Sequence, residues 1–132
     1  MLPSAIYIVS AGGGEAHAIT GYIVGTEGWK LSWSPDGSKI AFESDSLTHS
    51  GRGICTINSD GSGFQRLTGD STYNSDPSWS HDGSKFTFSR YEIREYYNYY
   101  QIYVMNADGS NQHRITNNPG HDWGASWGPY HR

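Results

Sequence analysis

The segment LSWSPDGSKIAF, residues 31–42, is the most informative part of the sequence, because eight of its twelve residues recur in the same order in PSWSHDGSKFTF at residues 77–88. A third copy begins as ASWGP at residues 125–129. In both full copies, an Asp-Gly pair separates two short runs in which apolar and polar residues alternate. Glycine adopts the positive φ that a tight turn requires, and the alternation is typical of a half-buried strand. Each copy therefore predicts a β-hairpin.

A second motif lies between the copies of the first. It reads IYIVSAGG at residues 6–13, ICTINSDG at 54–61 and IYVMNADG at 102–109, so its period is 48 residues. An apolar residue and a threonine follow each copy at the same distance: Ile19-Thr20, Leu67-Thr68 and Ile115-Thr116. Two hairpins, and so four short strands, in a repeat of this length are typical of a β-propeller blade. We predict an all-β fold of four-stranded antiparallel blades, with the tryptophan run as the innermost strand.

The composition fits one small domain. We predict a single propeller domain over residues 1–132, with repeats at approximately 6–44, 54–90 and 102–127. With 9 Lys plus Arg and a net charge of −4, the chain lacks the basic surface of a nucleic-acid-binding protein. No apolar run approaches the roughly 20 residues of a membrane helix, so we expect no membrane insertion. Cys55 is the single cysteine, which excludes an internal disulfide and a cysteine-based zinc site, and we expect it to lie in the core.

The two interleaved motifs resemble the repeat of TolB-type β-propellers. Blades of that family carry a Trp-Ser-Pro-Asp-Gly turn, a Lys-apolar-x-Phe strand and an Ile-Tyr-Val-Met-Asn-Ala-Asp-Gly-Ser strand and turn. The resemblance extends from Ile6 to Trp127. It implies a bacterial protein whose propeller is a protein-interaction scaffold of the cell envelope, in the periplasm. No signal peptide is visible, which by itself favours the cytoplasm, so the location stays open.

Counted in blades, the chain holds the outer half of one blade, two whole blades and one further innermost strand. Propellers generally need four to eight blades to close. We therefore expect a homodimer that completes a six-bladed ring, in which each junction blade combines residues 125–127 of one copy with residues 6–20 of the other. That junction blade lacks its second strand, which the apolar residues 21–25 could replace. The alternative is that the chain is part of a longer propeller.

Loops that lead into the innermost strands are expected at one mouth of the central channel. They hold aromatic, amide and acidic side chains that suit a peptide, a glycan or a cation. The candidate binding residues are Trp29, Tyr73, Asn74, Asp76, His121, Asp122 and Trp123. The alternative is that the two tryptophans pack between neighbouring blades while the polar groups bond the loop backbone.

A tyrosine-rich run extends the turn between the second and third strands of one blade. Tyrosine combines a large contact area with a polar tip and a small entropy cost, as in many protein-binding surfaces. The candidate partner surface consists of Tyr91, Tyr96, Tyr97, Tyr99 and Tyr100. The alternative is that these rings pack on the adjacent blade or at the dimer junction.

The acidic residues do not point to catalysis. Four aspartates, each followed by glycine, recur in the predicted turns, and we expect their carboxylates to bond the turn backbone rather than calcium. No motif of a serine hydrolase, zinc peptidase or phosphate-binding loop is visible, so we predict no catalytic residue, cofactor or metal. The sequence indicates a non-enzymatic module for protein–protein interaction and self-assembly. The alternatives are a propeller that binds a small ligand, glycan or cation, and part of an enzyme's propeller domain.

Overall fold

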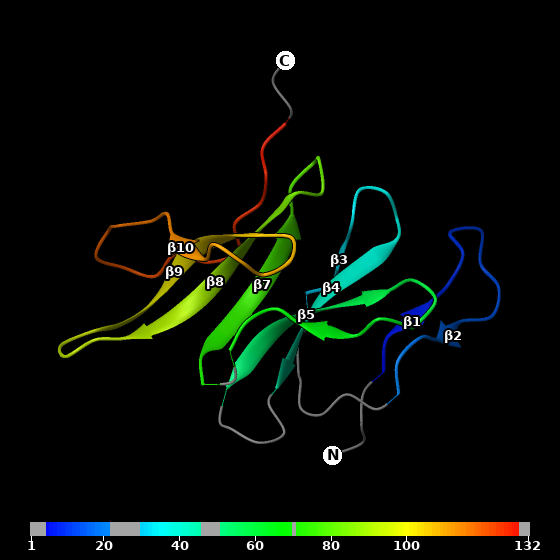
Figure 1. Ribbon diagram of the computed structural model, residues 1–132, viewed down its shortest axis with the longest axis horizontal. Helices are drawn as coiled ribbons and strands as arrows, with labels where there is room; N and C mark the ends of the chain where they lie inside the picture. Colours follow the sequence, from blue (N-terminus) through cyan, green and yellow to red (C-terminus); the bar gives the residue numbers. More distant parts are fainter. Residues whose placement is uncertain (1–4, 22–29, 46–50, 70, 130–132) are drawn as a thin grey trace.

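The computed structural model describes residues 5–21, 30–45, 51–69 and 71–129, and these residues form ten β-strands and no helix (Figure 1). Most of the apolar segment proposed as a replacement strand, residues 22–25, lies outside the described residues. No helix in the described ranges is long and apolar enough to span a membrane.

The strands form two whole blades and one half blade. The first whole blade contains β3 (Ser32–Trp33), β4 (Lys39–Asp45), β5 (Arg52–Asn58) and β6 (Gln65–Arg66), and neighbouring strands pair antiparallel. The second contains β7 (Tyr73–Trp79), β8 (Lys85–Ile93), β9 (Asn98–Asn106) and β10 (His113–Arg114), with the same pairing. The half blade contains β1 (Tyr7–Ile8) and β2 (His17–Ala18). These are the strands that the two motifs predict, with one exception: residues 125–127, predicted as a further innermost strand, form no strand in the structure.

The two whole blades are joined at one edge. A parallel bridge between Arg52 and Tyr73 connects β5 with β7, so that both blades belong to one eight-stranded sheet with β6 as a side branch. Within the described residues, neither this sheet nor the β1–β2 pair closes on itself. Figure 1 shows β1–β2 and β9–β10 at opposite ends of the molecule. The structure is therefore an open arc of blades.

The threonine of the second motif fastens the outer half of every blade. Its Oγ1 accepts the backbone N–H of the isoleucine that begins the third strand, at 2.8 Å in the half blade and at 2.9 and 3.0 Å in the whole blades. The three pairs are Ile6 with Thr20, Ile54 with Thr68, and Ile102 with Thr116. A fixed apolar-threonine spacing in the sequence thus has a hydrogen-bonding cause.

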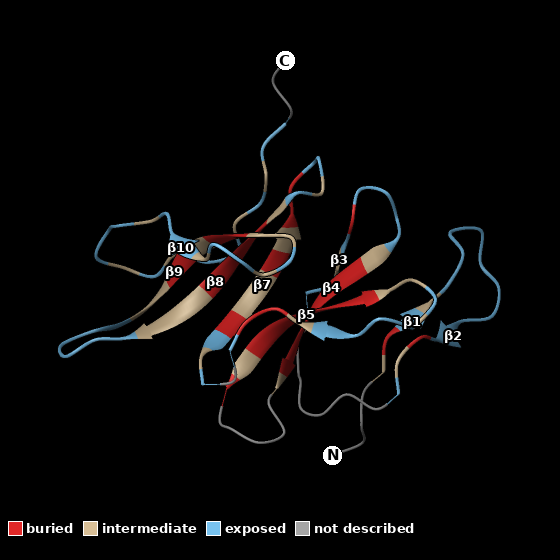
Figure 2. Cartoon of the chain, viewed as in Figure 1, coloured by how far each residue is buried: buried red, intermediate tan, exposed pale blue. Residues whose placement is uncertain are grey.

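The hydrophobic core lies between blades rather than within them. One cluster joins the half blade to the first whole blade and contains Ile6, Ile19, Ile40, Phe42, Cys55 and Ile57. The other joins the two whole blades and contains Ala41, Ile54, Leu67, Trp79, Phe86, Phe88 and Met105. Figure 2 shows the buried residues concentrated along β4, β5, β7, β8 and β9. Cys55 is fully buried, as predicted.

The recurring aspartates organise the turns, as predicted. The Oδ1 atom of Asp36 accepts hydrogen bonds from the Ser34 hydroxyl and from the hydroxyl and N–H of Ser38. Asp82 does the same with Ser80 and Ser84. Asp60 and Asp108 each accept two bonds from the serine two residues further on. The bonds from Ser34 and Ser38 lower the pKa of Asp36 to about 2, and those from Ser84 and Ser80 lower the pKa of Asp82 to about 2.

Candidate functional site

A long hairpin carries the tyrosine-rich run away from the core. The pairing of β8 with β9 continues without a break to Ile93 and Asn98, and the Arg94 N–H donates to the Tyr97 carbonyl at 3.0 Å to close the turn. Tyr96 and Tyr97 near the tip are 76% and 62% exposed, so neither packs on an adjacent blade. The hairpin therefore presents these two rings to solvent.

The link that follows β10 returns to the side of this hairpin. The Asp122 N–H donates to the Tyr100 carbonyl at 2.8 Å, and the Tyr100 N–H donates to Nδ1 of His121 at 3.2 Å. The Gln101 side chain donates to the Gly120 carbonyl at 2.8 Å. In a four-stranded antiparallel blade, the turn between strands two and three and the link after strand four emerge at the same end, which explains why these segments meet.

The meeting of the two segments joins two predicted surfaces into one, which we call the aromatic surface. Its neighbouring ring centroids are 5.0–6.4 Å apart, the range of favourable aromatic pairs. Tyr97 stacks on Tyr99, and the His121 ring contacts Tyr99, Tyr100 and Trp123. The aromatic surface consists of Tyr91, Tyr96, Tyr97, Tyr99, Tyr100, His121 and Trp123. Trp123 is 69% exposed in the structure, which does not match the alternative in which this ring packs between neighbouring blades.

Charged groups hold the base of the aromatic surface in place. Glu92 accepts hydrogen bonds from the Tyr103 hydroxyl, from Arg94 at 2.6 Å and from Arg114 at 3.1 Å. Burial raises the pKa of Glu92, but the bonds from Tyr103 and Arg94 outweigh burial, and the net pKa is lowered. Arg90 lies over the Phe88 and Tyr103 rings, with its guanidinium carbon 5.2 and 4.6 Å from their centroids. The hairpin therefore starts from a fixed base.

Asn74, predicted at the channel mouth, is a structural residue. Its side chain is 1% exposed. Its amide donates to the Arg52 carbonyl, Thr68 and Thr72, and its oxygen accepts from Arg90 at 2.8 Å. Because Asn74 is buried and both ends of its amide are hydrogen-bonded within the protein, it is not placed to contact a ligand at the surface. It connects the first whole blade to the second.

Asp76 lies at an irregularity of β7 and has a positive φ of 55°. Its N–H donates to Oε1 of Glu43 at 2.9 Å, and Oδ2 accepts from Ser75 and Ser89, each at 3.1 Å. Burial raises the pKa of Glu43, which is 3% exposed between the blades. In the next repeat Gly124, with φ of 64°, takes the place of Asp76 and donates its N–H to Ser89 at 3.1 Å. The same bent backbone thus recurs in the chain that follows each of the two whole blades, at Asp76 after β6 and at Gly124 after β10.

A shallow hollow of about 430 Å³ lies at this bend, beside the aromatic surface. It is lined by Lys30, Asp76, Trp123 and Gly124, and Lys30 lies 3.6 Å from the Asp76 carboxylate. The structure thus brings together Asp76 and Trp123 of the predicted mouth. Asp122 is half-buried, and its Oδ1 accepts from Asn118 at 3.2 Å.

The other predicted mouth residues are placed differently. Tyr73 is 44% exposed and pairs with Tyr91 in the sheet, at the margin of the aromatic surface. Trp29 lies outside the described residues. Sequence reasoning missed Glu43 and Lys30. It also missed the bend at Asp76, although the alignment of Asp76 with Gly124 in the repeat was a signal for a positive φ.

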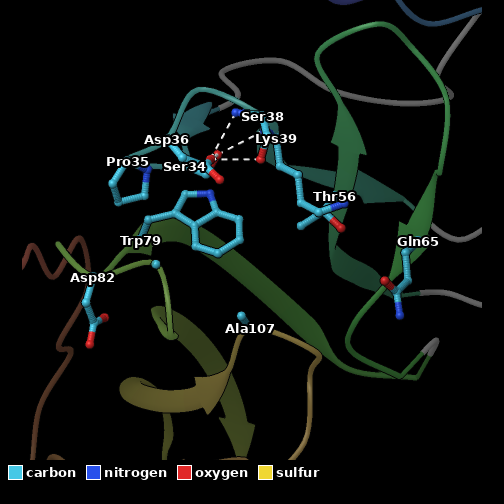
Figure 3. A pocket seen from close by; sticks show the side chains of 11 residues that line it. Ser34, Pro35, Asp36, Ser38, Lys39, Thr56, Gln65, Trp79, Asp82 and Ala107 are labelled. Atoms are coloured by element: carbon cyan, nitrogen blue, oxygen red, sulfur yellow. Dashed lines mark hydrogen bonds between the residues drawn. The ribbon is translucent and has the colours of Figure 1, made fainter.

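A second hollow, of about 280 Å³, lies at the turn end of the blades, opposite the aromatic surface. Figure 3 shows the Trp79 indole between the Ser34–Lys39 turn and Ala107. The carboxylates here, Asp36 and Asp82, each already accept three hydrogen bonds on Oδ1 within their own turns. The aromatic surface, with its exposed rings, is therefore the better candidate site.

Comparison with known proteins supports the fold. No protein-family model matches the sequence, and no curated protein matches it. Among solved structures, the chain is similar to a protein assigned as TolB from Agrobacterium tumefaciens, with a TM-score of 0.72 and 26% identity over 92% of this chain and 40% of that chain. It is also similar to TolB from Acinetobacter baumannii, with a TM-score of 0.69 and 22% identity over 89% of this chain and 28% of that one.

The fold and these structural likenesses together show that the chain has a β-propeller structure. More particularly, the structural likeness confirms the predicted TolB-type propeller fold. The chain spans 40% and 28% of the lengths of the two TolB structures, that is, less than half of either.

Proposed function

We propose that this chain is a non-enzymatic binding module, a TolB-like propeller scaffold that binds a protein or peptide partner through the aromatic surface. The observation that carries the proposal is the joining of the tyrosine-rich hairpin and the His121–Trp123 link into one set of contacting rings with exposed faces. Aromatic residues are enriched where proteins bind proteins.

The geometry favours tight binding because the hairpin is already ordered before a partner binds. The hairpin is paired to its tip, and Glu92 bonds Arg94, Arg114 and Tyr103 at its base. Tyrosine and tryptophan have few rotatable bonds, so a partner that buries their exposed faces loses little conformational entropy. Central rings of such a surface act as hot spots, at which truncation to alanine costs about 2 kcal/mol or more of binding free energy.

The proposal is tested with the triple variant Tyr96→Ala, Tyr97→Ala, Tyr99→Ala. Immobilised wild-type chain is used to capture a partner, whose affinity for the purified chain is then measured by calorimetry. We expect the triple variant to bind at least tenfold more weakly. The matched control is Phe64→Ala, which truncates a ring that is 58% exposed and lies before β6, at the turn end.

Equal binding by the triple variant and wild type would contradict the proposal. Heats with saccharides or divalent ions that vanish in Trp123→Ala or Asp122→Ala would instead support a small-ligand site at the hollow. Circular dichroism melts of each variant separate loss of binding from loss of fold.

Self-assembly is the second part of the proposed function. A second copy closes the open arc into a ring as a homodimer. The support is the arrangement in Figure 1, in which β1–β2 and β9–β10 lie at opposite ends of the arc and no described sheet closes on itself. Light scattering tests it: we expect twice the chain mass of 14.6 kDa, and a single-chain mass at all concentrations would contradict it.

A further inference from the structure

Two exposed surfaces at opposite ends of the arc each correspond, by the repeat, to a surface that is covered at the internal junctions. The first, which we call the β1 flank, consists of Tyr7, Val9 and the Gly13 turn. The second, the β10 flank, is centred on Ile115, directly after β10. The internal junctions of the same chain show what each flank contacts when it is covered.

At the internal junctions, a glycine turn lies directly on the end of the preceding blade's fourth strand. A Cβ added to Gly61 would lie 2.4 Å from the Ile19 carbonyl oxygen, and one added to Gly109 would lie 2.8 Å from the Leu67 carbonyl oxygen. Ile19 and Leu67 are only 9% and 8% exposed. The turn and the apolar residue beneath it thus form one close contact.

The same positions are open at the ends of the arc. Ile115, which corresponds to Ile19 and Leu67, is 53% exposed. Gly13, which corresponds to Gly61 and Gly109, has no described atom within 4 Å of an added Cβ. Val9 is 55% exposed, whereas the residue 48 positions later, Ile57, is 3% exposed. Each flank lacks the half that the other flank carries.

The free glycine turn already has the conformation of the covered ones. Its φ is 88°, against 88° at Gly61 and 87° at Gly109. The Gly13 N–H donates to the Ser10 carbonyl at 2.9 Å, the distance of the corresponding bond in both covered turns. The β1 flank therefore needs no rearrangement to dock, which reduces the entropy cost of association.

The packing direction is also fixed by the internal junctions. In the core cluster between the whole blades, Ile54 and Leu67 of the first blade face Met105 of the second. The residue that corresponds to Met105 in the half blade is Val9, and those that correspond to Ile54 and Leu67 at the other end are Ile102 and Ile115. If the two flanks meet as the internal blades do, Val9 of one copy faces Ile102 and Ile115 of another.

From these correspondences we infer that the β1 flank of one copy docks on the β10 flank of a second copy, with the Gly13 turn over Ile115, as the turns at Gly61 and Gly109 dock within the chain. This joint rests on the proposed self-assembly and assigns its residues and its direction. Because each joint uses one flank of each kind, a ring of two copies contains two identical joints.

The test uses Val9→Arg and Ile115→Arg, which place a charge in one flank each, and Ile93→Arg as a matched control on the hairpin. All three side chains are more than half exposed, at 55%, 53% and 77%, so each chain is expected to fold. Sedimentation equilibrium measures the dissociation constant of each dimer. We expect each flank variant to dimerise at least tenfold more weakly than wild type and the control to dimerise like wild type.

Mixing the two flank variants tests the direction. The Val9→Arg copy retains an intact β10 flank and the Ile115→Arg copy an intact β1 flank, so an equal mixture can form one intact joint and dimerises more tightly than either variant alone. A wild-type dimer that neither flank variant weakens would overturn the joint but leave self-assembly standing. A wild-type chain that never dimerises would overturn both.

Discussion

At the scale of single residues, two buried threonines differ in whether their hydroxyl groups are hydrogen-bonded. Thr68 and Thr87 are both buried, but only the first has a hydrogen-bonding role among the described residues. Oγ1 of Thr68 accepts from the N–H of Ile54 at 2.9 Å and from the amide of Asn74 at 3.2 Å. Oγ1 of Thr87 is buried without a hydrogen-bond partner in the described ranges. The two threonines therefore form a natural comparison.

We predict that Thr68→Val lowers the stability of the chain and that Thr87→Val does not. Valine keeps the shape of threonine but leaves the buried N–H of Ile54 unpaired at the first site, which costs about 1–3 kcal/mol of unfolding free energy. At the second site, valine removes a buried hydroxyl that lacks a partner, so stability stays the same or rises. Urea unfolding of both variants measures this. Equal destabilisation by the two would contradict the assigned role of Thr68.

The turn aspartates predict a dependence of stability on acid. Their pKa values of about 2 in the folded chain lie below the ordinary value of 3.8, because serine groups donate hydrogen bonds to the charged form. A lowered pKa adds stability at pH values above the ordinary pKa, and that stability is lost as the pH falls from about 4 to about 2.

The variant Asp36→Asn, Asp82→Asn tests this, because an amide keeps an acceptor oxygen but does not titrate. We expect the variant to be less stable than wild type at neutral pH and the difference to disappear near pH 2. Urea midpoints across the pH range give the measurement. A difference that stays constant with pH would mean that charge on these carboxylates does not stabilise the turns.

At the scale of strands and turns, two glycines allow the stability cost of a close contact between blades to be measured separately from the cost of backbone strain. Gly61 and Gly37 both have a positive φ, 88° and 72°. An added Cβ meets the Ile19 carbonyl oxygen at 2.4 Å at the first site and open space at the second. Alanine is strained at both sites, but only at Gly61 must the half blade also move.

We predict that Gly37→Ala costs about 1–2 kcal/mol, the strain of a left-handed backbone. Gly61→Ala costs a further 1 kcal/mol or so, because overpacking displaces the β1–β2 pair from its junction. Urea unfolding with an unchanged m-value compares the two variants. If Gly37→Ala is as destabilising as Gly61→Ala, the half blade can move away from Gly61 without loss of stability, and the close contact does not stabilise the fold.

The strands and turns of the blades could be predicted from the sequence because each motif contains its own local signals. The Asp-Gly turns and the alternating runs are short, continuous segments. Each threonine of the second motif bonds an isoleucine only 14 residues earlier in the chain. The meeting of the tyrosine hairpin with His121 and Trp123 was also within reach, since antiparallel strand order places both at one end of a blade. The composition of neither segment indicates this contact, which depends on the strand order of the whole blade.

The burial of Glu43 could not be predicted in the same way. Alternation along β4 places Glu43 opposite the inward-facing Phe42 and so suggests solvent exposure, yet the five residues from Ile40 to Ser44 are all buried. Both faces of a blade are covered by its neighbours, so the alternation rule does not hold there. The buried Glu43 carboxylate also accepts a hydrogen bond from the Asp76 N–H, at the bend of β7.

At the scale of the whole molecule, stability depends on the number of blade junctions. Both core clusters combine residues of adjacent blades, so each junction adds buried apolar surface that a blade alone lacks. Docking of the β1 flank on the β10 flank adds junctions of the same kind. Association and folding are then coupled, and the free energy of unfolding depends on protein concentration.

We predict that the thermal midpoint of the wild-type chain rises with concentration. A tenfold increase adds about 1.4 kcal/mol per dimer, which for a molecule of this size raises the midpoint by about 2–4 °C. In Ile115→Arg the joint is weakened, so the midpoint should be lower than that of wild type and should rise less over the same range, whereas the control Ile93→Arg should follow wild type. Calorimetric scans over a hundredfold range of concentration give the measurement. A wild-type midpoint that does not move would mean that the exposed flanks add nothing to the stability of the fold, and that the arc is stable with its ends open.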